Sequence, residues 1–424
     1  MVLLTFIDYF AGIMIENAQT KGRKKLALGL SLTANLSLLF FFKYYNFFSS
    51  QFNEYLNGHL PLLDIVLPLG ISFHTFQAMS YTIDVYLGRQ KAERHLGYFA
   101  LFIAYFPQMV AGPIERSQHL QHQLKQEQKF DYARGAEGFR LMLWGFFKKL
   151  VIADNLAVLV DAAYNSPQAN QGWFLLLATY CFAFQILCDF SGYTDIARGA
   201  AQIMGINLVE NFRRPYFAKS VQEFWQRWHM SLSTWFRDYV YIPLCGSKTP
   251  SLSRRLMAVM VVFTVSGLWH GANWTFIVWG ALNGLFYMVE TITKKQLAKV
   301  TDFELPKWAQ VFITFNLICV TWVFFRANNV TEGFFILQQI GKSFFGMGKS
   351  LIASIPLNVS APTAYGLFGV LILLYANLLE RKTLIQTTIG NQVTAVRWTL
   401  YVALAYGTII LGNVSAKQFI YFQF

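Results

Sequence analysis

The residue of this sequence best suited to acid–base chemistry is a histidine inside a long apolar stretch. His270 lies within residues 263–274, directly after Trp269. Because an ionisable side chain at membrane depth is energetically costly, its presence there is by default a sign of function. Ser266, four residues earlier, and Asn273, three residues later, are at helical spacings that would let them orient the imidazole. Such an imidazole could act as a general base toward a hydroxyl group, and a hydrogen-bonded core histidine is the alternative.

A second histidine flanks a stripe of aromatic side chains. His229 follows Trp228 and lies four residues after Trp225, at the boundary between a basic segment and the membrane. It is either a residue of the same site or a structural histidine at the interface. The remaining histidines are interpreted as surface or packing residues: His59, His74, His95, His119 and His122.

Two acidic residues lie in the second half of another apolar segment. Asp189 and Asp195 belong to residues 188–198, which end at Arg198. Buried carboxylates need a partner, and a paired structural network with Arg198 or with an incoming arginine would provide one. Direct participation in chemistry is the other interpretation.

Several common catalytic patterns are missing from the sequence. It has no Gly-x-Ser-x-Gly motif and no phosphate-binding glycine loop, and His229 and His270 have no further ligands at zinc-site spacing. No metal is therefore expected. The four cysteines are interpreted as small packing side chains: Cys181, Cys188, Cys245 and Cys319. The chemistry that remains is base-assisted attack of one bound substrate on another.

The composition places these residues in a polytopic helical membrane protein. The chain has 424 residues, of which 55% are hydrophobic and only 13% are charged. Soluble domains carry about 25% charged residues. The net charge of +13 is then explained by lysine and arginine on the cytoplasmic side of the membrane rather than by nucleic-acid binding. The expected class is all-α, with about nine to eleven membrane-spanning helices of roughly 17–25 residues each.

The apolar segments and their basic flanks predict the order of the spans. Residues 96–113 have basic residues on both sides, so they are expected to form a re-entrant segment that breaks at Pro107 and Pro113. Residues 2–15 form a weak tenth span. Lys299, Arg381 and Lys382 are expected to mark the basic side after two of the spans. The nine firm spans are 26–48, 61–86, 140–164, 173–198, 256–273, 275–291, 308–325, 363–379 and 397–414.

Residues 207–255 form the largest non-spanning block. Eight lysines and arginines against three acids place it in the cytoplasm. Large apolar residues recur there at spacings of three and four, which predicts one amphipathic helix that Pro243 terminates. The stripe consists of Trp225, Trp228, Leu232, Trp235 and Tyr239. The arginines of the block either hold an anionic substrate or mark topology against anionic lipid, and the candidates are Arg213, Arg214 and Arg237.

Five motifs in order resemble the membrane-bound O-acyltransferase family. They are PQMVAGPI at 107–114, DFSGYTD at 189–195, NFRRPY at 211–216, FWQRWHMSLSTW at 224–235 and GLWHG at 267–271. The match runs from about residue 26 to the C-terminal FIYFQF, and it is most similar to the branch of bacterial alginate O-acetyltransferase membrane subunits. The D-alanyl transfer proteins of teichoic acid are more distant.

The resemblance implies a single acyltransferase domain over residues 1–424 in the bacterial cytoplasmic (inner) membrane. It implies a cytoplasmic thioester donor, acetyl-CoA or an acyl-carrier thioester, and no bound cofactor. It also implies a polysaccharide acceptor and a secreted or membrane-anchored SGNH-type partner. Within the domain, the hairpin 256–291 would carry the central catalytic histidine, His270, and the block 207–255 would carry the donor-side histidine, His229. Trp269, Ser266, Asn273 and Trp228 would line the substrate channel.

Two alternatives remain open at this stage. The transferred group could instead be D-alanyl or acetyl, and the acceptor could be teichoic acid or peptidoglycan. A transporter with broken helices and buried ionisable residues is the alternative from a different class. A transporter is expected to show two related halves, whereas the polar residues here are concentrated in residues 189–273.

Overall fold

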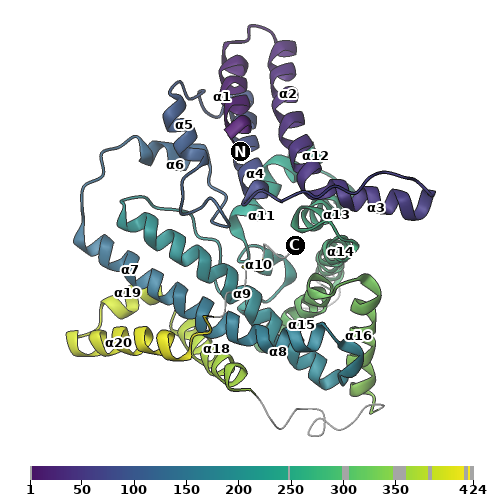
Figure 1. Cartoon of the computed structure of the whole chain (residues 1–424), viewed down its shortest axis with the longest axis vertical. Helices are drawn as coiled ribbons and strands as arrows, with labels where there is room; N and C mark the ends of the chain where they lie inside the picture. Colours follow the sequence, from purple (N-terminus) through teal and green to yellow (C-terminus); the bar gives the residue numbers. More distant parts are fainter. Residues whose placement is uncertain are drawn as a thin grey trace. The chain divides into compact units, whose positions relative to one another are not determined.

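The computed structural model describes residues 2–246, 249–297, 305–346, 360–380, 384–414 and 419–420. All regular structure within these ranges is helical (Figure 1). The predicted all-α class is therefore confirmed. The expected basic flank after two spans, at Lys299, Arg381 and Lys382, lies outside the described residues. The chain divides into two compact units, the first formed by Met1–Gly135 with Ala200–Val209 and the second by Ala136–Gly199 with Glu210–Phe424.

Seven helices of the described chain are long and apolar enough to cross a membrane. They correspond to seven of the nine expected spans: Lys21–Leu56, Gly172–Ile203, Leu252–His270, Trp274–Gln296, Lys307–Arg326, Ala361–Leu379 and Thr394–Leu411. In Gly172–Ile203 72% of the apolar window is buried, whereas on the other six helices less than half of it is buried, and in Thr394–Leu411 only 6%. This exposure suits lipid contact, because lipid tails are as apolar as the side chains that face them.

The other two expected spans differ from the sequence prediction for local reasons. In 61–86 the helix begins only at Ile71, because Gly70 has a left-handed backbone with φ of 70°. A Cβ atom at Gly70 would lie 2.2 Å from the carbonyl oxygen of Met109. Residues 140–164 are helical throughout, but Lys148, Lys149 and Asp154 make this segment too polar to count among the seven.

The first unit is built around a bundle of α1, α2 and α4, and α2 continues without a break into α3 as the 36-residue helix Lys21–Leu56. Inside this bundle the buried carboxylate of Asp8 accepts hydrogen bonds from Ser31 (2.5 Å) and Asn35 (2.9 Å). The predicted re-entrant segment is helical only over α5 and breaks before Pro107. The helices are α1 (Val2–Asn17), α2 (Lys21–Leu39), α3 (Tyr45–Leu56), α4 (Ile71–Tyr86), α5 (Leu96–Ile103) and α6 (Ser117–Leu124), with a π-helical segment, Phe40–Tyr44, between α2 and α3.

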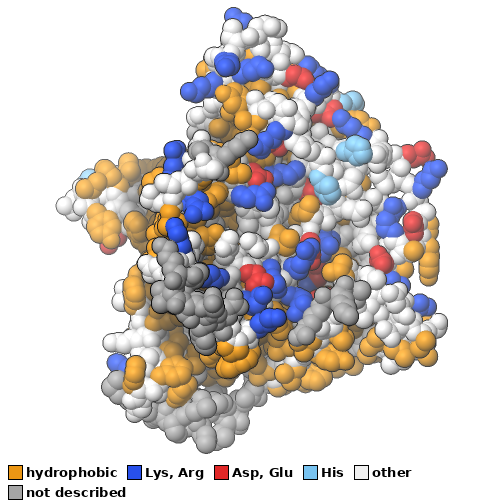
Figure 2. Space-filling view, turned by 180° about the vertical axis from the view of Figure 1, so that it is seen from behind, with side chains coloured by type: hydrophobic (Ala, Val, Ile, Leu, Met, Phe, Trp, Pro, Cys, Tyr) orange, Lys and Arg blue, Asp and Glu red, His pale blue; other side chains and the backbone are white. Residues whose placement is uncertain are grey.

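The second unit contains most of the long apolar helices and a large aromatic core. Its first helices are α7 (Tyr132–Phe146), the π-helical segment Phe147–Ala153, α8 (Asp154–Tyr164) and α9 (Gly172–Ile203). Three short helices follow: α10 (Val221–Trp225), α11 (Met230–Phe236) and α12 (Ile242–Cys245). The remaining helices are α13 (Leu252–His270), α14 (Trp274–Leu297), α15 (Lys307–Arg326), α16 (Val330–Phe344), α18 (Ala361–Leu379), α19 (Ile385–Gly390) and α20 (Thr394–Leu411). Figure 2 shows a face on which basic and acidic side chains lie close together, bordered by hydrophobic ones.

The prediction of one amphipathic helix through the aromatic stripe is wrong. The helix ends after Trp225 and starts again at Met230, because His229 adopts a left-handed backbone with φ of 42°. Tertiary hydrogen bonds hold this break, since the N–H of Met230 donates to the carbonyl oxygen of Asn211 (3.0 Å). Pro243 does not end the segment either. It lies at the start of α12, which continues directly from the π-helical segment Arg237–Tyr241, and Gly246 ends that helix with φ of 66°.

Candidate functional site

His270 is the last residue of α13 and lies in an aromatic enclosure. The side chain is buried, and its ring is 5.0 Å from Trp269, 5.0 Å from Trp279 on α14 and 5.4 Å from Phe325 on α15, measured between ring centroids. Gly271 follows in an extended conformation, and a Cβ atom there would lie 2.1 Å from the ring of Phe276. The close turn between α13 and α14 therefore holds His270 at a fixed place in the core.

The two residues expected to orient His270 have different surroundings. Ser266 is buried one turn earlier on α13. Asn273 directly precedes α14, where its side-chain oxygen accepts the N–H of Thr275 (3.0 Å) and its amide donates to the carbonyl oxygen of Asn328 (3.2 Å). These contacts give Asn273 a role in the helix start, and its action on the imidazole stays a prediction.

His229 lies between α10 and α11 and is almost completely buried. Its ring centroid is 4.7 Å from that of Phe190 on α9 and 6.4 Å from that of Phe212. The imidazole Nδ1 is 3.3 Å from the side-chain oxygen of Asn211. Burial lowers the pKa of His229 to about 3 from its ordinary value near 6.5, because the charged form would lose its hydration. The imidazole is therefore neutral at physiological pH.

Trp269 joins the two histidines. Its ring centroid is 6.3 Å from that of His229 and 5.0 Å from that of His270. Trp228 is buried beside them and packs against Phe212, with the ring centroids 5.0 Å apart. The structure thus brings His229, His270, Trp228 and Trp269 into one buried cluster of rings, although the sequence separates them by up to 42 positions.

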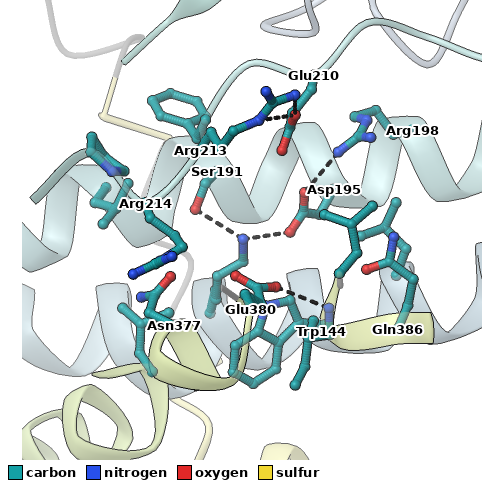
Figure 3. Close-up of a pocket in the computed structure, with 18 residues that line it drawn as sticks. Trp144, Ser191, Asp195, Arg198, Glu210, Arg213, Arg214, Asn377, Glu380 and Gln386 are labelled. Atoms are coloured by element: carbon teal, nitrogen blue, oxygen red, sulfur yellow. Dashed lines mark hydrogen bonds and ion pairs between the residues drawn. The ribbon is translucent and has the colours of Figure 1, made fainter. Parts of the chain in front are cut away.

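A charged pocket of about 360 Å³ lies beside this cluster (Figure 3). Phe212 lines the pocket and also packs against His229, so it connects the two features. Asp195, Arg213 and Arg214 of the predicted site line the pocket. Its other polar lining residues are Lys148, Ser191, Arg198, Glu210, Asn377, Glu380 and Gln386.

Ion pairs organise the pocket. Lys148 donates to the hydroxyl of Ser191 (3.0 Å) and pairs with Asp195, which also lies 3.8 Å from Arg198. Arg213 pairs with Glu210, three residues earlier in the chain (Figure 3). The guanidinium of Arg214 stacks over the ring of Phe217, 5.0 Å from its centroid. The pocket offers four basic and three acidic side chains, and arginine forks of this kind suit phosphate or carboxylate groups.

Close helix packing places Lys148 in this pocket. A Cβ atom at Gly192 of α9 would lie 2.8 Å from the carbonyl oxygen of Gly145 on α7. The two glycines therefore allow the backbones to approach so that Lys148 reaches Ser191 and Asp195. Two adjacent lysines in an apolar segment were a signal for this role, because a buried lysine needs an acidic partner.

Asp189 and Arg237 lie outside the lining of the pocket. Asp189 pairs with Lys149 at 2.6 Å, and its other oxygen accepts the N–H of Ile420 (2.7 Å). Lys149 also pairs with Asp154 (2.7 Å), so Asp189 belongs to a structural network whose cation is a lysine rather than the expected arginine. Arg237 is exposed and pairs with its neighbour Asp238. Among the described residues, no group of three or more histidine, cysteine or acidic side chains could hold a metal ion.

These features define a multi-pass helical membrane protein with two buried histidines, one shared tryptophan and an adjoining charged pocket. The sequence pattern of the membrane-bound O-acyltransferase family matches residues 94–331, which is more than half of the chain and includes both histidines. The protein belongs to this family, as the motifs predicted.

Curated relatives come from three branches of the family. The chain is 38% identical over 362 residues to the peptidoglycan O-acetyltransferase of Helicobacter pylori, covering 78% of this chain and 67% of that protein. It is 40% identical over 336 residues to the probable alginate O-acetylase of Pseudomonas aeruginosa, covering 77% and 62%. It is 30% identical over 286 residues to the teichoic acid D-alanyltransferase of Bacillus subtilis, covering 64% and 71%. The chain spans less than two thirds of the alginate O-acetylase, and the names of these relatives support an O-acyltransferase.

Proposed function

We propose that this protein moves an acyl group, most simply acetyl, from a cytoplasmic thioester to a hydroxyl acceptor for O-acetylation of an extracytoplasmic polysaccharide such as alginate. The donor would be acetyl-CoA or an acyl-carrier thioester, and the membrane would be the bacterial inner membrane. The observation that carries the proposal is the buried cluster of His229, Trp269 and His270 beside a pocket lined by Arg213 and Arg214.

The proposed reaction is a single acyl transfer. The acceptor oxygen attacks the thioester carbonyl carbon while His270 takes the hydroxyl proton. The carbon–sulfur bond breaks, and the leaving thiolate regains a proton from the imidazolium. His229 is neutral and cannot supply a charge, so its role is to orient the donor. The arginines of the pocket would hold the anionic groups of the donor.

The acceptor distinguishes the remaining alternatives. Peptidoglycan and teichoic acid are supported by the names of two relatives, and alginate by the name of a third. A secreted or membrane-anchored SGNH-type protein is the proposed partner that completes transfer outside the membrane. The transporter alternative loses its support because the chain belongs to an acyltransferase family.

The test is the variant His270→Ala. Membrane vesicles that contain the protein receive acetyl-CoA with a labelled acetyl group, and base-labile label is measured in the envelope polymer fraction. General acid–base catalysis contributes roughly 10²–10⁴-fold, so a loss on the order of 100-fold or more is expected. His122→Ala, at an exposed histidine on α6, is the matched control and should retain activity. Near-normal transfer by folded His270→Ala would refute the assignment.

A further inference from the structure

Asn211 is almost completely buried and contacts both the backbone and the side chain of the segment that carries His229. Its carbonyl oxygen accepts the N–H of Met230 (3.0 Å). Its side-chain oxygen Oδ1 accepts the N–H of Ser231 (3.1 Å) and lies 3.3 Å from Nδ1 of His229. Asn211 thus touches three consecutive residues at the break between α10 and α11.

These contacts determine which end of the Asn211 amide faces His229. The oxygen and nitrogen of an asparagine side chain have almost the same shape, so hydrogen bonds must assign them. The backbone N–H of Ser231 is only a donor, and the atom it faces must therefore be the oxygen. Since Oδ1 carries no proton, its contact with His229 is a hydrogen bond only when Nδ1 of the imidazole is protonated.

The backbone conformation of His229 supports a fixed geometry. A positive φ of 42° is unusual for a residue with a side chain and persists where the surroundings enforce it. The hydrogen bonds of Met230 and Ser231 to Asn211 provide that enforcement, and Phe190 packs edge-on against the imidazole at 4.7 Å. Neighbouring residues therefore fix both the direction in which the imidazole of His229 points and its rotation about the side-chain bond.

We propose that Asn211 is the positioning residue of His229, holding its imidazole as the Nδ1–H tautomer so that Nε2 is the accepting nitrogen. His229 then receives a hydrogen bond from its substrate and cannot donate one to a carbonyl oxygen through Nε2. In the proposed reaction, the matching group on a phosphopantetheine-type donor is an amide N–H near the thioester. Burial keeps this imidazole neutral, so its tautomer decides what it can bind.

The assignment is tested by nitrogen NMR on the full-length protein in lipid nanodiscs, with ¹⁵N in the histidine rings. His229→Ala identifies the resonances of His229. Wild-type protein should show the Nδ1–H tautomer from pH 5 to pH 8. Asn211→Asp keeps an acceptor and should preserve that tautomer, whereas Asn211→Leu removes it and should give Nε2–H or a mixture. Asn283→Leu changes another fully buried asparagine, which bonds only its own helix, and should leave the tautomer unchanged.

Transfer kinetics provide a second measurement, which rests on the proposed function. Asn211→Leu should lower kcat by about tenfold, the loss expected for one hydrogen bond, and change the donor KM much less. The same change should have no further effect in a His229→Ala background, because Asn211 acts through His229.

The NMR and the kinetic measurements distinguish the positioning role of Asn211 from the proposed function of the protein. An Nε2–H tautomer in wild-type protein, or an Asn211→Leu protein with an unchanged tautomer, would overturn the positioning role. The predicted tautomers in proteins that transfer no acyl group would support that role and count against the proposed function alone.

Discussion

His229 does not titrate in the pH range in which an exposed histidine does. Its pKa is lowered to about 3 by burial, so the imidazole stays neutral from pH 5 to pH 8. We expect the ratio of wild-type to His229→Gln transfer activity to be constant across this range, because neither side chain changes charge. A pH profile of kcat/KM for both proteins measures it. A ratio that changes with a midpoint near pH 6.5 would show that His229 titrates normally.

The same pKa predicts how stability depends on pH. Between about pH 6.5 and pH 3 the unfolded chain binds a proton at His229 that the folded protein excludes. The free energy of unfolding therefore falls as pH is lowered through this window. In His229→Gln the contribution is absent, so thermal unfolding at pH 7 and pH 5 should differ less in the variant than in wild-type protein. An equal or larger pH difference in His229→Gln would contradict this expectation.

At the residue scale, the sequence could predict the histidines but not their partners. His270 was a candidate because a polar ring among apolar residues is costly, and His229 because it flanks the aromatic stripe; their roles in the reaction stay predictions. The role of Asn211 was not, because it lies 18 residues from His229 and depends on a left-handed backbone that no local pattern requires. Lys148 likewise pairs with Asp195 across 47 residues, because the π-helical segment Phe147–Ala153 packs against α9.

At the element scale, the α13–α14 hairpin depends on glycines that let two backbones touch. A Cβ atom at Gly267 would lie 2.2 Å from the carbonyl oxygen of Phe276, and one at Gly280 would lie 2.2 Å from that of Phe263. Gly267→Ala should separate the helices and cost about 1–3 kcal/mol of stability, as overpacking does. Because His270 is three residues away, transfer activity should fall as well. Thermal unfolding and the acyl-transfer assay measure the two effects.

A glycine without such a contact provides the control for the hairpin. Gly341 of α16 has no atom within 4 Å of the place a Cβ would occupy. Gly341→Ala should therefore leave activity unchanged and stabilise the helix by at most about 1 kcal/mol. Equal effects of the two alanine substitutions would mean that the close approach of α13 and α14 is unimportant for the site.

Helical spacing predicted most elements and failed where tertiary bonds override local preference. The stripe from Trp225 to Tyr239 has the period of one helix, yet the bonds from Asn211 break it at His229. Periodicity reports which face is buried, and the stripe agrees with this: Trp228, Leu232 and Trp235 are buried, and Trp225 and Tyr239 are partly buried. Periodicity carries no information about contacts with distant segments. Here such a contact, from Asn211, decides whether the helix continues past His229.

At the scale of the whole molecule, charge links topology to the proposed chemistry. Residues 207–255 carry eight basic and three acidic residues, so the charge rule places them in the cytoplasm. Arg213 and Arg214 belong to this block and line the charged pocket. An acyl-CoA or acyl-carrier donor is anionic and cytoplasmic, so the same residues would fix orientation and attract the donor.

If Arg213 and Arg214 both fix the topology and attract the donor, use of the donor should depend on the membrane face and on salt. Donor use should occur from the cytoplasmic face only, and it should weaken with added salt, because exposed charges are screened beyond about 8 Å at physiological ionic strength. Replacing both Arg213 and Arg214 with glutamine should raise the donor KM and flatten its salt dependence. The loss of Arg213 also leaves Glu210 without its ion-pair partner, which adds repulsion toward an anion. Titration of acetyl-CoA on inside-out and right-side-out vesicles, at low and high salt, measures all three quantities.

The control removes the same charge from the exposed surface outside the pocket. Lys219 and Lys295 are exposed and do not line the pocket, so Lys219→Gln combined with Lys295→Gln should leave the donor KM near that of wild-type protein. If this control raised KM as much as the arginine pair does, general surface charge would explain the attraction and the pocket would not. Equal donor use from both faces would contradict the cytoplasmic assignment of the block. Accumulation of substrate inside sealed vesicles without ester formation would favour transport, because a transferase consumes its donor where it binds.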